Sequence, residues 1–154
     1  GCDHCGGSGY QGQAAIFETR GNLECHVILR GGKQPNYQKA DVDAACALLQ
    51  AAGLREQVMI DVSHANSSKQ HQRQIAVAAE VAAQIAAGDR RITGVMIESH
   101  LEEGRQDIVP GQPLKHGVSV TDACISLAQT VPVLQGLAAA VQLRRSHANP
   151  HTKD

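Results

Sequence analysis

Three residues of different chemistry, Arg30, His64 and Glu98, stand 34 positions apart, and each closes a short apolar run. The runs are HVILR (26–30), VMIDVSH (58–64) and ITGVMIE (92–98). A cation, an imidazole and a carboxylate brought together could bind a metal ion beside an anionic substrate. Whether they meet depends on the elements that carry them.

The apolar runs are rich in β-branched and aliphatic residues, and long helix-like segments separate them. Strands that alternate with helices at this repeat are typical of parallel βα units, which predicts an α/β fold. In such units the carboxyl ends of the strands lie at one edge of the sheet, where ligands bind. The spacing therefore predicts that Arg30, His64 and Glu98 converge.

The segments between and after the runs carry helix signals. A helix is predicted over about Ala40–Ala52, with Gly53 as its stop, and a second between the Asn66-Ser67-Ser68 cluster and Gly88. A long loop over Leu101–Ser119 follows the third run, and loops of this length are often functional. Thr121 and Thr130 are candidate caps of a final helix.

The candidate residues suit a divalent metal and an anion. His64 and Glu98 could share Mn, Fe, Co or Zn, with Asp122 as a third ligand. The guanidinium of Arg30 would suit a phosphate or a carboxylate. Simpler roles stay open, because His64 could be a hydrogen-bonded or capping residue and Asp122 a helix cap. Arg30 could also form a salt bridge to Asp61.

Composition excludes some classes of partner. The chain is 42% hydrophobic and 19% charged with a formal net charge of −1, which gives no reason to expect nucleic acid or an anionic membrane. Its longest apolar stretch, LAAAVQL (137–143), is far shorter than the ~20 residues of a membrane span. Five cysteines in no framework spacing favour reduced thiols and a cytoplasmic location.

Length bounds the architecture. A (β/α)8 barrel needs about 250 residues, whereas this chain has 154 and three strong strand signals. Three parallel strands cannot close a barrel, and the chain opens on Gly1 without an initiator Met. We therefore expect a piece of a larger α/β protein rather than a small open domain.

Several long motifs resemble one enzyme family. They are CHVILRGGKQPNY (25–37), DVSHANSSKQ (61–70), AAQIAAGDR (82–90), GVMIESHLEEGRQ (94–106) and SVTDACI (119–125). Together they resemble the type I DAHP (3-deoxy-D-arabino-heptulosonate 7-phosphate) synthases over about residues 13–145. The resemblance implies the last three βα units of a (β/α)8 barrel with part of an accessory β-hairpin. Residues 1–12 are expected to be a flexible leader unlike the family, and 146–154 a polar tail.

The resemblance also implies roles for single residues. His64, Glu98 and Asp122 match three of the family's four metal ligands, and Arg30 matches an arginine that binds the phosphate of phosphoenolpyruvate. His64 and Arg30 are thereby expected to contact substrate and take part in catalysis. The family's fourth ligand is a cysteine on the first barrel strand, which has no counterpart here. The Lys-Pro-Arg-Thr motif for erythrose 4-phosphate is also absent.

The implied function is the condensation of phosphoenolpyruvate with erythrose 4-phosphate, the first step of the shikimate pathway to aromatic amino acids. A divalent metal, a homo-oligomeric complete enzyme and the cytoplasm are expected with it. The 154-residue chain alone is expected to be an inactive portion of that enzyme. Two alternatives remain: a non-catalytic fragment or degenerate copy, and a small metal- or phosphate-binding α/β module.

Overall fold

The computed structural model describes residues 4–8, 14–18, 20–22 and 24–148. Its centre is a parallel sheet in which β4 lies between two neighbours. The strands, in sheet order, are β3 (Val27–Leu29), β4 (Val58–Asp61) and β5 (Ile92–Met96). This arrangement confirms the predicted α/β fold with parallel strands, because each of the three apolar runs contributes one strand.

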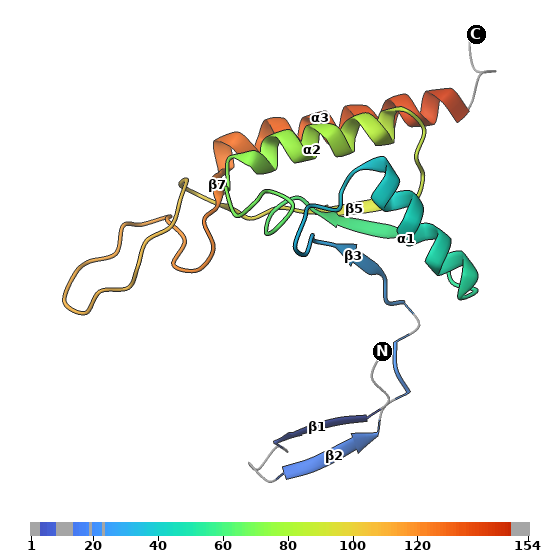
Figure 1. Ribbon diagram of the computed structural model, residues 1–154. Helices are drawn as coiled ribbons and strands as arrows, with labels where there is room; N and C mark the ends of the chain where they lie inside the picture. The colour runs from blue at the N-terminus through green and yellow to red at the C-terminus, as the bar shows by residue number, and fades with distance from the viewer. Residues whose placement is uncertain (1–3, 9–13, 19, 23, 149–154) are drawn as a thin grey trace.

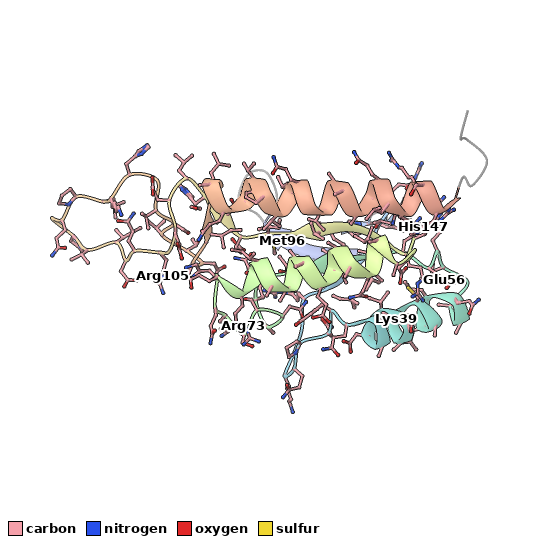
Figure 2. All side chains as sticks on the ribbon, turned by 90° about the horizontal axis from the view of Figure 1, so that it is seen from above. Lys39, Glu56, Arg73, Met96, Arg105 and His147 are labelled. Atoms are coloured by element: carbon pink, nitrogen blue, oxygen red, sulfur yellow. The ribbon has the colours of Figure 1, made fainter. Side chains whose placement is uncertain are left out.

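Three helices form a layer over the sheet (Figures 1 and 2). They are α1 (Lys39–Ala51), α2 (Arg73–Ala86) and α3 (Leu127–Ala148). Both views show α2 and α3 side by side along their length, and Figure 2 shows α1 on the other side of α2. Within the described part of the chain, no helix has the length and apolar content that crossing a membrane requires.

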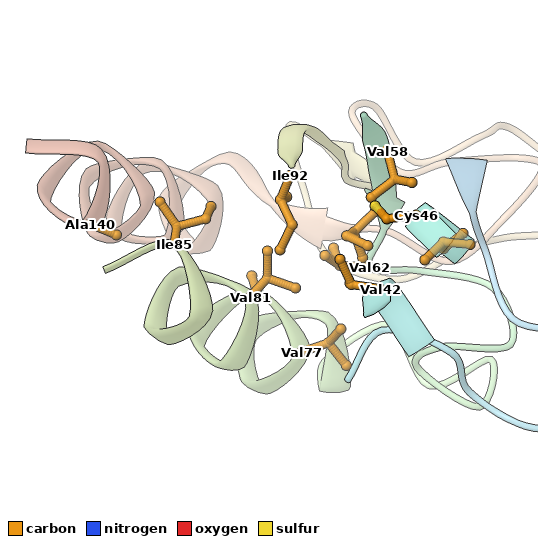
Figure 3. Close-up of a cluster of buried hydrophobic side chains, with 12 residues drawn as sticks. Val42, Cys46, Val58, Val62, Val77, Val81, Ile85, Ile92 and Ala140 are labelled. Carbon is orange, nitrogen blue, oxygen red and sulfur yellow. The ribbon is translucent and has the colours of Figure 1, made fainter. Parts of the chain in front are cut away.

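The hydrophobic core lies between β4 and the helix layer (Figure 3). Val58 and Ile60 of β4 have no exposed surface, which fits the central place of this strand. Val81 of α2 and Val42 of α1 pack into the same cluster and are also fully buried. The sheet is thus anchored to the helices through β4, the strand that leads to His64.

Two smaller strand pairs complete the fold. β1 (His4–Ser8) and β2 (Ala14–Glu18) form an antiparallel hairpin, drawn apart from the parallel sheet in Figure 1. β6 (Ser99–His100) and β7 (Ile125–Ser126) pair in parallel where the loop after β5 returns. β1 lies within residues 1–12, the stretch for which a flexible leader was expected. Residues 1–3, 9–13 and 149–154, which include parts of that leader and of the predicted polar tail, lie outside the described residues.

The helix ends differ from prediction where side-chain caps were expected. α1 ends as predicted, with Gly53 at a φ of 68° just past the C-cap. α2 begins only at Arg73, after several turns that follow the Asn66-Ser67-Ser68 cluster, so this cluster does not cap it. α3 begins at Leu127, so neither Thr121 nor Thr130 is its cap, and Thr130 instead donates to the carbonyl of Ser126.

Candidate metal and anion site

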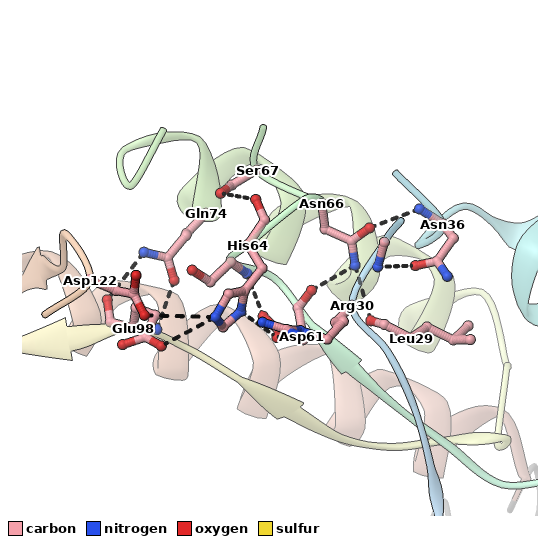
Figure 4. A network of polar contacts seen from close by, with 12 residues as sticks. Leu29, Arg30, Asn36, Asp61, His64, Asn66, Ser67, Gln74, Glu98 and Asp122 are labelled. Atoms are coloured by element: carbon pink, nitrogen blue, oxygen red, sulfur yellow. Dashed lines mark hydrogen bonds and ion pairs between the residues drawn. The ribbon is translucent and has the colours of Figure 1, made fainter. Parts of the chain in front are cut away.

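Three predicted ligands meet at the carboxyl ends of the strands (Figure 4). His64 lies three residues past β4, Glu98 two residues past β5, and Asp122 in the segment that leads to β7. The Nε2 atom of His64 is 3.8 Å from Oε1 of Glu98 and 3.9 Å from Oδ2 of Asp122. One ligand atom from each residue lies within 4.8 Å of the others.

The Asp61 carboxylate orients the His64 imidazole. Its Oδ2 atom is 2.7 Å from Nδ1 of His64, and its Oδ1 accepts from the backbone N–H of Ser63 at 2.8 Å. An ionised carboxylate can only accept, so the shared hydrogen belongs to Nδ1 and the lone pair stays on Nε2. His64 adopts a φ of 44°, an uncommon conformation for a non-glycine residue. The ring therefore offers its free nitrogen to Glu98 and Asp122.

The donor set suits a divalent cation. Two atoms bound to one ion at about 2.0–2.2 Å lie at most about 4.4 Å apart, and both distances from His64 Nε2 are shorter than this. One imidazole and two carboxylates are ligands that Mn, Fe, Co and Zn accept. The Asp61–His64 pair is the carboxylate–histidine arrangement that commonly supports metal-bound histidines. These three residues can therefore hold a metal ion.

Arg30 directly follows β3 at the same edge of the sheet. Its Nε lies 3.8 Å from Oδ2 of Asp61, so the salt bridge considered from the sequence is present. The Arg30 side chain is 60% exposed, and its guanidinium carries five N–H donors. Such a pair still leaves guanidinium donors available to an anion.

Two side-chain amides, of the buried Asn66 and the half-buried Asn36, fix the end of β3 beside His64. Asn66, which has no exposed surface, donates to the carbonyls of Leu29 at 3.0 Å and Asp61 at 2.7 Å. Its Oδ1 accepts from the backbone N–H of Asn36 at 2.8 Å, and the side chain of Asn36 in turn accepts from the Gly31 N–H at 2.6 Å.

A Cβ at Gly31, where φ is +75°, would lie 3.0 Å from the Asn66 backbone nitrogen. This close approach explains the glycine after Arg30.

A cavity of about 250 Å³ opens beside the ligand cluster. His64 and Asp122 line it together with the cationic residues Lys69 and Arg105. A larger apolar hollow of about 410 Å³ lies between α2 and α3, and no candidate ligand lines it. The chemically relevant space is thus the smaller, polar one, because it is the cavity that reaches the ligand atoms.

The long loop after β5 is tied to the helices through Glu103. This carboxylate accepts from Gln72 at 2.6 Å, from His71 at 2.8 Å and from Gln129 at 3.1 Å. The hydrogen bond from Gln72, followed by that from His71, lowers the pKa of Glu103. An ionised Glu103 thereby holds the loop against α2 and α3 on the rim of the cavity.

Residues 24–148 contain three cysteines, and two of these, Cys46 and Cys124, are buried. Burial raises the pKa of the Cys46 thiol in α1 and of Cys124. Cys124 lies 3.9 Å from Oε2 of Glu98. Cys25, in contrast, is exposed.

Comparison with known proteins identifies the family of this chain. The sequence model of the DAHP synthetase I family matches residues 6–135. The chain belongs to this family. The match begins inside the stretch that we had expected to differ from the family, so the resemblance extends further toward the amino terminus than the motifs suggested.

Individual relatives support the assignment. The chain is 55% identical over 133 residues to a Trp-sensitive phospho-2-dehydro-3-deoxyheptonate aldolase of Enterobacter agglomerans, covering 86% of this chain and 38% of that protein. It is 54% identical over 142 residues to a tyrosine-inhibited one of Schizosaccharomyces pombe, covering 89% and 38%. A solved structure of the aldolase from Francisella tularensis superposes with a TM-score of 0.83 at 48% identity. That superposition covers 92% of this chain and 41% of the other.

The chain therefore spans about two fifths of the length of the relatives it matches. Its α/β fold with parallel strands corresponds to a portion of a DAHP synthase structure. Within this portion, the structure brings together His64, Glu98 and Asp122, the three residues that were predicted as ligands. The sequence pattern missed the buried amides of Asn66 and Gln74. It also missed the role of Asp61 in orienting the His64 ring. The sequence feature that could have indicated this role is the position of Asp61, an acidic residue at the end of an apolar strand and three positions before His64.

Proposed function

We propose that this chain forms the carboxyl-terminal part of a DAHP synthase, supplying the last three βα units of a (β/α)8 barrel and part of an accessory β-hairpin. The reaction is the condensation of phosphoenolpyruvate, D-erythrose 4-phosphate and water to DAHP and phosphate, at the entry to aromatic amino acid biosynthesis. In this proposal residues 13–145 belong to the barrel and 146–154 form a polar tail. The complete enzyme would be a homo-oligomer in the cytoplasm.

The grouping of His64, Glu98 and Asp122 carries the proposal. These are the three residues that the family resemblance assigns to the metal, and one atom of each lies within 4.8 Å of the others. A divalent ion of the Mn, Fe, Co or Zn class held there would supply Lewis-acid polarisation of the aldehyde oxygen. Asp61 would keep the His64 lone pair aimed at the site.

Arg30 would hold the phosphate of phosphoenolpyruvate by fork-shaped hydrogen bonds. Its exposed guanidinium and its place at the same sheet edge as His64 support this role. With the phosphate held, C3 of phosphoenolpyruvate forms a bond to the aldehyde carbon of erythrose 4-phosphate. Water adds at C2, the bond from C2 to the phosphate oxygen breaks, and inorganic phosphate leaves. The two protons of the water go to the former aldehyde oxygen, which becomes a hydroxyl, and to the departing phosphate, while C2 becomes a carbonyl. Arg30 would therefore contribute mainly by positioning phosphoenolpyruvate for the reaction.

We expect the 154-residue chain by itself to catalyse no condensation. It contains no counterpart of the cysteine ligand or of the Lys-Pro-Arg-Thr motif implied by the resemblance. Fixing reactants in place can supply about 7–11 kcal/mol of barrier lowering, and one arginine cannot hold two phosphorylated substrates.

A hybrid enzyme tests the proposal. Residues 13–145 would replace the matching portion of the Phe-sensitive aldolase of Escherichia coli K12, which is 54% identical to this chain over 134 residues. We expect the hybrid to form DAHP, with activity lost on chelation and restored by Mn²⁺. His64→Ala should abolish the activity, whereas Cys46→Ala, in the core of α1, should change it little. A folded but inactive hybrid would favour a degenerate, non-catalytic copy instead.

A further inference from the structure

Gln74 is a buried polar residue that no part of the proposed reaction uses. It is the second residue of α2, and only 1% of its surface is exposed. Its Nε2 donates to the carbonyl of Glu98 at 3.1 Å, and its Oε1 accepts from the Glu98 N–H at 2.8 Å. A single carboxamide thus bonds both polar groups of the Glu98 backbone, as a neighbouring strand would (Figure 4).

The backbone of Glu98 needs such a partner because the strand ladder stops short of it. The pairing of β4 with β5 ends at Asp61 and Met96, and Glu98 lies two residues further on. The Ile125 N–H bonds the Glu98 carbonyl at 3.0 Å, so this carbonyl has a second partner. The partner of the Glu98 N–H is Gln74. Both hydrogen bonds of Gln74 are partly shielded from water, and they fix the position of the Glu98 backbone against α2.

The same stretch of chain carries His64 and Gln74. The segment after β4 first presents the His64 ring and then turns into α2, whose first turn places Gln74 against Glu98. The separation of 3.8 Å between His64 Nε2 and Glu98 Oε1 is therefore set at both ends by one continuous segment. A helix anchored in the core holds this geometry, because Val77 of α2 is 2% exposed.

We propose that Gln74 is a positioning residue, which fixes the backbone of Glu98 so that its carboxylate faces His64. The proposal rests on the metal site proposed above. Gln74 does not contact the metal or a substrate in this account; it acts through the ligand that it holds.

Mn²⁺ alone is the probe for the first test, with the 154-residue chain as the protein. Gln74→Met keeps a side chain of similar length and removes both hydrogen bonds. Residues that hold metal ligands in place commonly contribute about 10- to 100-fold to metal affinity, and we expect a loss in this range. Gln84→Met is the matched control, because Gln84 lies on the same helix and donates to the Tyr37 carbonyl at 2.9 Å. An equal loss in both variants, or no loss in Gln74→Met, would overturn the proposal.

Amide hydrogen exchange of the unsubstituted chain is a second test, independent of any metal or variant. The Glu98 amide should exchange as slowly as the amides inside β5, although it lies outside the strand ladder. Exchange of this amide at the rate of an unstructured peptide would overturn the positioning role, regardless of the Mn²⁺ affinities measured in the first test. If the chain binds no Mn²⁺ but this amide is protected, the metal site is wrong and the hold of Gln74 on Glu98 stands.

Discussion

Replacing Asp61 with Asn tests how the site orients its histidine. The Asp61 carboxylate accepts from the Ser63 N–H through one oxygen and contacts Nδ1 of His64 at 2.7 Å through the other. In Asp61→Asn the amide oxygen can keep the bond to Ser63, which turns the NH2 group toward Nδ1. Nδ1 must then accept, so the ring hydrogen moves to Nε2. That nitrogen loses the lone pair that a metal needs.

The size of the effect follows from burial. The side chains of Asp61 and His64 are 2% and 24% exposed, so water screens their interaction only weakly. A hydrogen bond to a charged group contributes about 1.5–3 kcal/mol, and about 1.4 kcal/mol corresponds to a tenfold change in an equilibrium constant. We therefore expect Asp61→Asn to weaken Mn²⁺ binding by about 10- to 100-fold, which agrees with the effect of such supporting carboxylates elsewhere.

The assay is a titration of the chain with Mn²⁺, in which electron paramagnetic resonance measures the free ion. Asp43→Asn is the control, because Asp43 bonds Lys39 and Arg91 at the far end of the sheet. This control should bind Mn²⁺ like the unsubstituted chain. Affinity of Asp61→Asn within twofold of the unsubstituted chain would refute the reasoning, since it would show that His64 does not need Asp61.

Three further outcomes are expected. Gly31→Ala should destabilise the fold by about 1–3 kcal/mol in urea unfolding, because φ is +75° and the new Cβ would lie 2.7 Å from a neighbouring side chain. Cys46 should resist alkylation at neutral pH while the exposed Cys25 reacts, because burial raises the pKa of the Cys46 thiol. The Arg91 side chain lowers the pKa of Asp89 below 3.8, so this pair stabilises the fold above that pH. The contribution of the Asp89–Arg91 pair should vanish as pH falls through the pKa of Asp89 in the folded state. In Arg91→Gln, the urea concentration at the unfolding midpoint should therefore change less with pH in this acid range.

Each of these has a result that would contradict it. Gly32→Ala should be nearly neutral, since a Cβ there meets nothing within 4 Å, and equal losses at both glycines would argue against local strain. Rapid alkylation of Cys46 in the native chain, detected by mass spectrometry, would show that its core opens. An unchanged acid dependence in Arg91→Gln would show that the arginine does not hold the Asp89 carboxylate.

The sequence could predict the strands and their convergence because both follow from patterns along the chain. A buried parallel strand must be apolar throughout, and the 34-residue repeat brings successive strand ends to one edge. The convergence of His64 and Glu98 was therefore predicted from spacing, whereas Asp122 was a candidate by residue type and gained further support from the family motif. The fold class and the ligand group thus depended on periodic burial and on residue type, which sequence records directly.

Other features of the site depend on tertiary contacts that leave no local pattern. Gln74 looks like a surface residue in RQIAVAAE, but its position opposite the end of β5 buries it. Asn66 stands in a cluster typical of helix caps, although its side chain bonds two strand ends instead. Which amide becomes buried is decided by how β3, β4 and β5 align, and this alignment is not encoded in any single segment.

The central claim is that His64, Glu98 and Asp122 bind one divalent metal. Electron spin-echo envelope modulation of Mn²⁺ bound to the chain tests it most directly, because this signal detects nitrogen coordinated to the ion. We predict a nitrogen signal that disappears in His64→Ala. It should persist in His71→Ala, whose ring lines the same cavity but bonds Glu103. A nitrogen signal that survives His64→Ala unchanged would contradict the account.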